Sequence, residues 1–293
     1  MDFLRPTSWR EALELRAARP EATVLAGGTD VLVEVNFGHR SPEALLDLTN
    51  ISELQDWSES GGLVRIGAGL PYTRLIDELG DRLPGLAMAS RTVGSPQIRN
   101  RGTLGGNLGS ASPAGDAHPA LLASDAEIEV ASVRGTRLLP ITEFFTGPKR
   151  NALAADELIA AVHLAPASGP QQFAKVGTRN AMVIAVCTFA IALHPQRRQV
   201  GTGVGSAAPT PFRARAAEDF LATELTDTDQ WEHPRALPDL AANRFGELVA
   251  AAASPIDDVR GTAGYRRHAL GVLARRTVHR VWDEHRTWRR QCA

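Results

Sequence analysis

Glycine is concentrated in the stretch TVGSPQIRNRGTLGGNLGSASPAGDAHPALLA at residues 92–123, against an otherwise ordinary background. Six glycines fall within its 22 residues from Gly94 to Gly115, about three times the average of a chain with 26 glycines in 293 residues. Paired glycines such as Gly105 and Gly106 let the backbone come close to an anion, so several N–H groups can point at phosphate oxygens. The segment therefore predicts a backbone cradle for a phosphate-bearing ligand.

A second glycine pair occurs earlier, in AGGTD at residues 26–30. Neither segment matches a Rossmann fingerprint or a Walker loop, because the first needs G-x-G-x-x-G after a strand and the second a Gly-Lys-Ser/Thr ending. Short hydroxyl and amide side chains accompany the glycines: Thr29, Thr103, Asn107, Ser110 and Ser112. Two carboxylates, Asp30 and Asp116, could accept from a ribose or ribityl hydroxyl. We interpret the segments as two halves of a pyrophosphate cradle; two tight turns with helix-capping Asp30 and Asp116 are the alternative.

Composition limits the possible functions. The chain has 32 Lys and Arg against 33 Asp and Glu, a net charge of −1, which argues against nucleic-acid binding. A length of 293 residues suggests two or three packed units. Two cysteines, Cys187 and Cys292, are too few for a disulfide framework or a four-thiolate iron–sulfur cluster. Any cluster chemistry must therefore come from another chain.

The sequence also predicts a cytoplasmic protein with no membrane span. Arg5, Arg10 and Glu11 interrupt the region where a signal peptide would need an apolar core. The longest apolar stretch, 181–193, is well short of the roughly 20 residues that cross a bilayer. We interpret this stretch as a buried core strand.

Periodicity predicts an α+β fold, with strands first and helices last. We expect a helix over 9–16 capped by Ser8, a second helix ending at Gly80, and helices over 212–221, 238–253 and 262–290. The last helix is basic, and a solvated face or a protein contact fits a neutral chain better than an RNA-binding face. Strands are expected over 23–26, 44–48, 63–68, 158–164 and 199–204, with a hairpin over 127–133 and 136–141. Residues 165–169 (APASG) read as a linker, so we place a domain boundary near residue 168.

The chain resembles the FAD-binding subunit of the molybdenum hydroxylases, the family that includes xanthine dehydrogenase and aerobic carbon monoxide dehydrogenase. The resemblance extends nearly end to end, through LAGGTD at 25–30, the stretch 92–123, FAKVGTRNAMVIAVCTFAIAL at 173–193 and SPIDDVRGTAGYRRHALGVLARR at 254–276. It implies an FAD-binding domain of the vanillyl-alcohol oxidase (PCMH) type at 1–168, with subdomains of about 1–55 and 56–168. Residues 169–293 would form a smaller domain like the carbon monoxide dehydrogenase flavoprotein C-terminal domain, a three-stranded antiparallel sheet packed on helices.

The resemblance also implies roles for individual residues. Two runs would hold the pyrophosphate mainly through backbone N–H groups: Ala26, Gly27, Gly28 and Thr29, and Thr103, Gly105, Gly106 and Asn107. Ser110 and Asp116 would contact the sugar and ribityl parts, as a carboxylate at Asp30 could. Val24, Leu25 and Val93 would line the cofactor channel, and Ile159 would lie against the cofactor. Lys175 would lie near the flavin, where a cation can stabilise negative charge on the reduced ring; a solvent-exposed strand lysine is the alternative.

The implied function is electron transfer without a catalytic base in this chain. A large molybdenum–pterin (molybdopterin) partner would oxidise substrate, a small partner's 2Fe-2S clusters would conduct electrons, and FAD here would deliver them to NAD or another acceptor. AGGTD, where some carbon monoxide dehydrogenase flavoproteins have AGGHS, slightly favours a xanthine dehydrogenase-like branch. A self-sufficient flavin oxidoreductase and a non-catalytic nucleotide-binding interaction protein are the alternatives. We expect no metal site, since His268 and His279 lack an evident third ligand.

Overall fold

The computed structural model describes the backbone of residues 1–292 and the side chains of residues 1–287. The chain forms two compact units that interleave in sequence. Unit 1 comprises Met1–Glu78, Val93–Ser112 and Ala126–Ala165, and unit 2 comprises Leu79–Thr92, Pro113–Asp125 and the chain from Pro166 onward. Two short segments that precede the predicted boundary at residue 168 thus pack with the C-terminal part of the chain.

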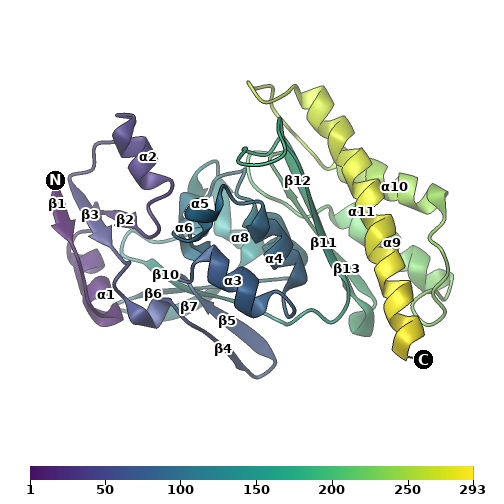
Figure 1. The fold of residues 1–293 in the computed structure, drawn as a ribbon, viewed down its shortest axis with the longest axis horizontal. Helices are drawn as coiled ribbons and strands as arrows, with labels where there is room; N and C mark the ends of the chain where they lie inside the picture. The colour runs from purple at the N-terminus through teal and green to yellow at the C-terminus, as the bar shows by residue number, and fades with distance from the viewer. Residues whose placement is uncertain (293) are drawn as a thin grey trace. The chain divides into compact units, whose positions relative to one another are not determined.

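Unit 1 contains two main sheets, shown with their labels in Figure 1. The first is parallel, in the order β1-β3-β2, and the second is antiparallel, in the order β4-β5-β10-β6-β7. Their strands are β1 (Asp2–Leu4), β2 (Thr23–Leu25), β3 (Ala44–Asp47), β4 (Trp57–Ser60), β5 (Leu63–Gly67), β6 (Glu127–Ser132), β7 (Gly135–Pro140) and β10 (Leu158–Leu164). The strands and the hairpin predicted for this part of the chain are confirmed. A two-stranded ribbon, β8 (Phe145–Gly147) with β9 (Arg150–Asn151), completes the unit's strands.

The helices of unit 1 are short. The predicted N-terminal helix is confirmed as α1 (Trp9–Ala18), and the Ser8 hydroxyl accepts a hydrogen bond from the Glu11 N–H as its cap (3.2 Å). The helix expected to end at Gly80 is α3 (Tyr72–Leu79), whose last residue already belongs to unit 2. The others are α2 (Val31–Asn36), η1 (Ser52–Leu54), α5 (Pro96–Arg99), α6 (Leu104–Ser110) and α8 (Ile141–Phe144).

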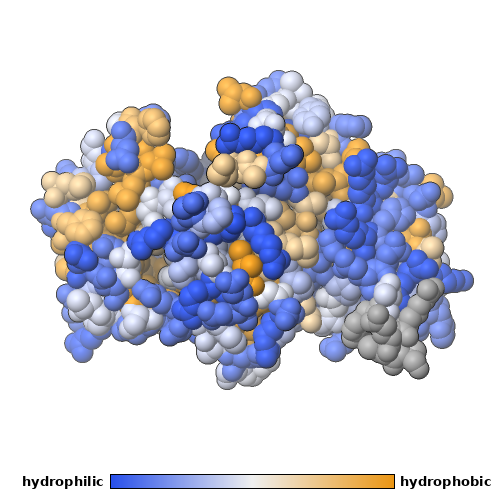
Figure 2. Space-filling view, in the orientation of Figure 1, coloured by the Kyte–Doolittle hydropathy of each residue, from blue (hydrophilic) through white to orange (hydrophobic). Residues whose placement is uncertain are grey.

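Helix α2 exposes apolar side chains. None of its residues is buried, and Leu32, Val33 and the following Phe37 are all exposed. Figure 2 shows hydrophobic surface over this helix. Contiguous exposed apolar surface is typical of protein contact sites.

Unit 2 is built on the antiparallel sheet β11-β12-β13, comprising β11 (Gln171–Val176), β12 (Cys187–His194) and β13 (Gln199–Gly205). Alternate residues face opposite sides of a strand. On β12, Phe189 and Ile191 join the apolar core formed with the C-terminal helices, whereas His194 faces α7 and its Nε2 lies 3.2 Å from the Ala123 carbonyl oxygen. The predicted three-stranded sheet packed on helices is therefore confirmed, with helices on both faces.

The helices of unit 2 are α4 (Pro84–Arg91), α7 (Ala117–Ala123), η2 (Pro195–Arg197), α9 (Arg215–Asp227), α10 (Asp239–Ala251) and α11 (Ala263–Cys292). Helices α4 and α7 come from the two segments inserted in sequence within unit 1, and both pack on the sheet. Helices α10 and α11 lie against each other, as Figure 1 shows. The predictions over 238–253 and 262–290 are confirmed.

Two element predictions in unit 2 were wrong. The expected core strand over 181–193 begins only at Cys187, because Met182 adopts a left-handed φ of +50° and Ile184 is 53% exposed. The helix expected from residue 212 begins at Arg215, because Phe212 instead pairs with Val204 in a two-way backbone bridge. In both cases local backbone geometry overrides the apolar pattern.

Helix α11 also contains a buried arginine. Arg266 is only 4% exposed and donates to the carbonyl oxygens of Val186 (3.2 Å) and Ser206 (2.8 Å), while its guanidinium pairs with Asp258. The neighbouring Tyr265 is 52% exposed. No helix among the described residues combines the length and apolar character required to cross a membrane.

Candidate functional site

The two glycine segments of unit 1 lie directly against each other. A Cβ added at Gly27 would sit 1.9 Å from the carbonyl oxygen of Arg101, a separation that real Cβ atoms do not show. The ideal Cβ position of Gly102 is 3.6 Å from Thr29 Oγ1. Gly28 adopts a φ of +77°, which glycine tolerates without steric cost. The turn at 26–30 and the loop before α6 therefore form one continuous backbone surface.

The glycine-rich stretch that contains Gly105 and Gly106 is helical at these residues, which the sequence did not predict. Leu104–Ser110 (LGGNLGS) forms α6 although glycine disfavours helices. Close packing explains Gly105, since a Cβ there would lie 2.6 Å from both the Cβ and the carbonyl oxygen of Ala68. The Thr103 hydroxyl caps the helix by accepting from the Gly106 N–H (3.0 Å). A Cβ at Gly106 would lie 3.2 Å from that hydroxyl and 3.6 Å from Ala26 Cβ.

Polar contacts also join the two segments. The Ser110 hydroxyl at the end of α6 donates to Asp30 Oδ2 (2.9 Å).

Asp30 and Asp116 occupy the N-cap positions of α2 and α7, but neither side chain makes a capping hydrogen bond. The two carboxylates therefore take the N-cap positions that the helix-capping alternative gives them, but without its side-chain hydrogen bond.

The remaining predicted residues of unit 1 flank this surface. Val24 and Leu25 lie on β2, which leads into the turn, and Val93 precedes α5, where its carbonyl accepts from Arg99 Nη1 (3.2 Å). Ile159 on β10 is 7% exposed, and its Cδ1 is 4.0 Å from the ideal Cβ position of Gly109 on α6. Asn107 lies within α6 itself.

In unit 2 the structure pairs the other two predicted residues. Lys175 on β11 donates from Nζ to Asp116 Oδ2 (2.5 Å) and to the carbonyl oxygen of Thr92 (3.3 Å), where α4 ends. The side chains of Lys175 and Asp116 are only 10% and 9% exposed. A buried charge is stable only when it is paired, so this ion pair excludes the interpretation of Lys175 as a solvent-exposed strand lysine.

Asp116 has spare hydrogen-bonding capacity. Its Oδ1 is buried without a hydrogen-bond partner among the described residues. Burial raises the pKa of this carboxyl group, and the charge and hydrogen bond of Lys175, with a side-chain hydrogen bond of Thr92, only partly oppose that effect. An unsatisfied buried acceptor is an unusual feature in a native structure, and a donor from a bound ligand would satisfy it.

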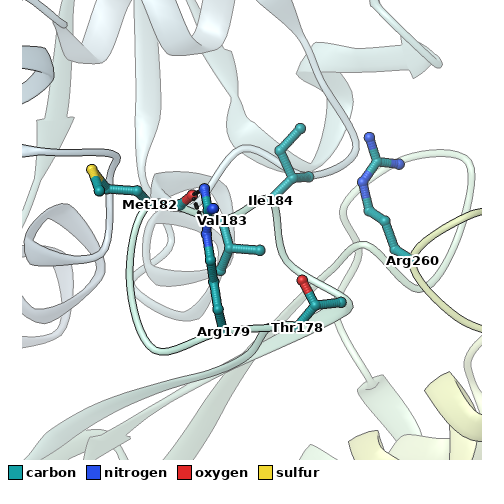
Figure 3. A pocket seen from close by; sticks show the side chains of 6 residues that line it. All are labelled: Thr178, Arg179, Met182, Val183, Ile184 and Arg260. Atoms are coloured by element: carbon teal, nitrogen blue, oxygen red, sulfur yellow. Dashed lines mark hydrogen bonds between the residues drawn. The ribbon is translucent and has the colours of Figure 1, made fainter.

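Unit 2 also contains a pocket of about 460 Å³ between the loop after β11 and the loop before α11 (Figure 3). It is lined by Thr178, Arg179, Met182, Val183, Ile184 and Arg260. Figure 3 shows Arg179 turned back on its own loop, where Nε donates to the Met182 carbonyl oxygen (3.0 Å). None of the lining residues is among those predicted to bind a cofactor.

Other candidate chemistry is not assembled in the described part of the chain. No group of three His, Cys, Asp or Glu residues there could hold a metal ion. His279 Nε2 lies 3.3 Å from Asp239 Oδ1, and His268 is exposed. Burial raises the pKa of the Cys187 thiol to about 12, which leaves it protonated and unreactive. Cys292 lies beyond the residues whose side chains are described.

Sequence reasoning missed the residues that complete these contacts. Arg101 and Ala68 offer backbone and Cβ atoms against the glycines, and Thr92 offers a carbonyl to Lys175. Arg101 and Thr92 both lie within the glycine-rich stretch 92–123, which is the one signal that pointed to them. Ala68 carries no signal at all, because an alanine after a strand is unremarkable.

Comparison with known proteins places this geometry in a family. Residues 1–167 match the model of the FAD binding domain in molybdopterin dehydrogenase, and residues 172–281 match the CO dehydrogenase flavoprotein C-terminal domain. The xanthine dehydrogenase FAD-binding subunit of Escherichia coli O157:H7 is 32% identical over 289 residues, covering 94% of each chain. The nicotine 6-hydroxylase medium subunit of Paenarthrobacter nicotinovorans is 32% identical over 286 residues, covering 94% of this chain and 95% of that one.

A solved structure agrees with the sequence relatives. A chain of the reconstituted CO dehydrogenase from Oligotropha carboxidovorans superposes with a TM-score of 0.88 at 28% identity, covering 97% of this chain and 98% of that chain. Both domain models and both sequence relatives describe parts of oxidoreductases. The chain therefore belongs to the FAD-binding subunits of the molybdenum hydroxylases, and it is a subunit of a multi-subunit oxidoreductase.

Proposed function

We propose that this chain carries FAD and transfers electrons from the 2Fe-2S clusters of a small partner subunit to NAD or another acceptor. A large partner subunit with a molybdopterin centre would oxidise the substrate. The single observation that best supports an FAD site is the contact of Gly27 with the Arg101 carbonyl, because it joins the two glycine segments into one backbone surface. FAD supplies reversible two-electron chemistry when bound, and the protein supplies binding, orientation and electrostatics.

The pyrophosphate is assigned to unit 1. Backbone N–H groups of Ala26–Thr29 and Thr103–Asn107 would hold its oxygens, which glycines permit by removing the Cβ atoms that would stand in the way. Ser110 would contact the sugar or ribityl hydroxyls together with Asp30, which accepts a hydrogen bond from the Ser110 hydroxyl. Val24, Leu25 and Val93 would line the channel, and Ile159 would lie against the cofactor from β10.

Two residues of unit 2 are assigned to the polar parts of the cofactor. Asp116 would accept from a ribityl hydroxyl, and its unsatisfied buried Oδ1 suits that donor. Lys175 would lie near the ring, where its ammonium would favour negative charge on the reduced flavin. The chemistry of both residues is thus compatible with FAD.

We also propose that residues 1–168 form an FAD-binding domain of the PCMH type, followed by a separate domain at 169–293. The limits of the matching family models at 167 and 172 support this boundary. The three-stranded sheet lies within residues 2–47 and the five-stranded sheet within 57–164, which supports subdomains of about 1–55 and 56–168.

The complex that we propose is xanthine dehydrogenase-like and cytoplasmic. AGGTD at 26–30 supports this branch over the carbon monoxide dehydrogenase branch. Sequence identity also favours this branch, since the chain is 32% identical to a xanthine dehydrogenase subunit and 28% identical to the CO dehydrogenase chain. The exposed apolar surface of α2 supports the existence of partner subunits.

The test is the visible spectrum of the protein purified from its native host. We expect flavin bands near about 370 and 450 nm, iron–sulfur absorption and two co-purifying subunits. A different result would be a flavin-containing chain without partner subunits that reduces a dye with NADH at a rate comparable with that of the complex. That result would indicate a self-sufficient oxidoreductase. A colourless protein that takes up no added FAD would contradict the proposal and favour a non-catalytic interaction protein.

A further inference from the structure

We propose that Asp116 is a positioning residue and counter-ion for Lys175, so that the net charge of the pair, and not Lys175 alone, tunes the bound cofactor. This inference rests on the proposed FAD site. It differs from a plain cofactor contact because it gives Asp116 an effect on the electron affinity of the cofactor that is opposite in sign to that of Lys175.

The first argument is burial. Both side chains are nine-tenths buried, and Nζ and Oδ2 are 2.5 Å apart, within the range of a charge-assisted hydrogen bond. At this depth solvent screens a charge weakly, so each member of the pair strongly offsets the field of the other. A neighbour of the pair therefore experiences little of the charge that Lys175 would exert by itself.

The second argument is rigidity. Asp116 is the N-cap residue of α7, and three residues earlier the Pro113 carbonyl accepts from the N–H of Ser206 (2.8 Å), which directly follows β13. Lys175 is held on β11 and also donates to the Thr92 carbonyl oxygen (3.3 Å). Because both partners are anchored on packed elements, the pair has one geometry before any cofactor binds.

The third argument is the second carboxylate oxygen. Oδ2 is occupied by Lys175, while Oδ1 is buried and unsatisfied among the described residues. A hydroxyl donated to Oδ1 would stabilise the ionised carboxylate, because hydrogen bonds to the charged form favour it. Cofactor binding and the charge of the pair are then coupled through one residue.

The experiment measures the flavin midpoint potential of the holoenzyme in four forms: wild type, Lys175→Met, Asp116→Asn and the double variant. Lys175→Met should shift the potential to lower values at a pH above the pKa of Asp116, where it leaves the negative charge of the carboxylate unbalanced. Asp116→Asn should shift it to higher values, since it leaves the positive partner uncompensated. The double variant should return close to wild type. Lys175→Arg, which keeps the charge, should also stay close to wild type.

The result that overturns the inference is an Asp116→Asn potential equal to or lower than that of the wild type. If Asp116→Asn does not fold, the double variant decides: recovery of folding on adding Lys175→Met supports charge compensation, because a lone buried charge is costly. Failure of both forms to fold overturns it. A wild-type complex without flavin would refute the proposed function instead, so the two failures are distinguishable.

Discussion

The glycine surface of unit 1 and the ion pair of unit 2 are built on different physical principles. The first depends on missing atoms, since Gly27 and Gly105 let backbone segments approach where a Cβ would overlap them. The second depends on charge, since Lys175 and Asp116 are buried and held by each other. Side-chain size should therefore perturb the first region and side-chain charge the second.

The largest effect is expected for Gly27→Ala. Its Cβ would overlap the Arg101 carbonyl, so two backbone segments must separate, at a cost of about 3 kcal/mol or more in the free energy of unfolding. Chemical denaturation measures the change. Gly264→Ala is the control, because its Cβ enters open space in α11 and alanine should gain up to about 1 kcal/mol there. Equal stability of the two variants would contradict the backbone contact.

Two glycines of one helix sharpen the same point. In α6, Gly105→Ala places its Cβ 2.6 Å from Ala68, whereas Gly109→Ala meets only Ile159 Cδ1 at 4.0 Å. We expect Gly105→Ala to lose about 2 kcal/mol through overpacking and Gly109→Ala to be neutral or slightly stabilising. Thermal unfolding of the apo chains compares them. A Gly109→Ala chain as unstable as Gly105→Ala would show that helix α6, and not its packing, is the cause.

The charge side of the comparison extends to Arg266. Arg266→Met removes the donor to four acceptors of unit 2, the carbonyl oxygens of Val186, Ser206 and Gly261 and the carboxylate of Asp258. We expect a loss of about 2 kcal/mol in the free energy of unfolding. Arg276→Met, on an exposed position of the same helix, should change it by less than about 0.5 kcal/mol. Similar changes in the free energy of unfolding for the two variants would contradict a stabilising role of the buried Arg266 contacts.

The smallest effect concerns His194, which links β12 to α7. Burial lowers the pKa of its imidazole below the ordinary value, so the folded chain binds fewer protons there than the unfolded chain. The corresponding stability is present above the ordinary His pKa of about 6.5 and is lost as pH falls towards the lowered value. His194→Gln should flatten this part of the pH–stability curve. An unchanged slope below about pH 6.5 would assign the acid sensitivity to other groups.

Much of the fold could be predicted because its signals are local. Ser8 caps α1 as expected, and the strands with apolar alternation appear within two residues of their predicted limits. Helix α6 could not be predicted, because its three glycines disfavour a helix, and the close contact with Ala68 accounts for only one of them, Gly105. The late start of β12 depends on a left-handed residue, Met182, that no pattern indicates.

The candidate site divides in the same way. The glycine pairs indicated a close backbone approach, and the structure brings the two segments together. The partner of Lys175 could not be predicted from residues alone, because Asp116 is 59 positions away in sequence. The interleaving of the two units is equally a property of packing, since α4 and α7 leave no mark that assigns them to the C-terminal sheet.

The most direct test of the glycine surface as a pyrophosphate site is a competition experiment on the purified chain. ADP, which has the pyrophosphate, or riboflavin, which lacks it, is added, and the FAD that stays bound is separated from free ligand and quantified by chromatography. We predict saturable binding of one FAD per chain, displaced by ADP far more readily than by riboflavin. Absence of saturable binding, or displacement by riboflavin but not by ADP, would contradict the assignment.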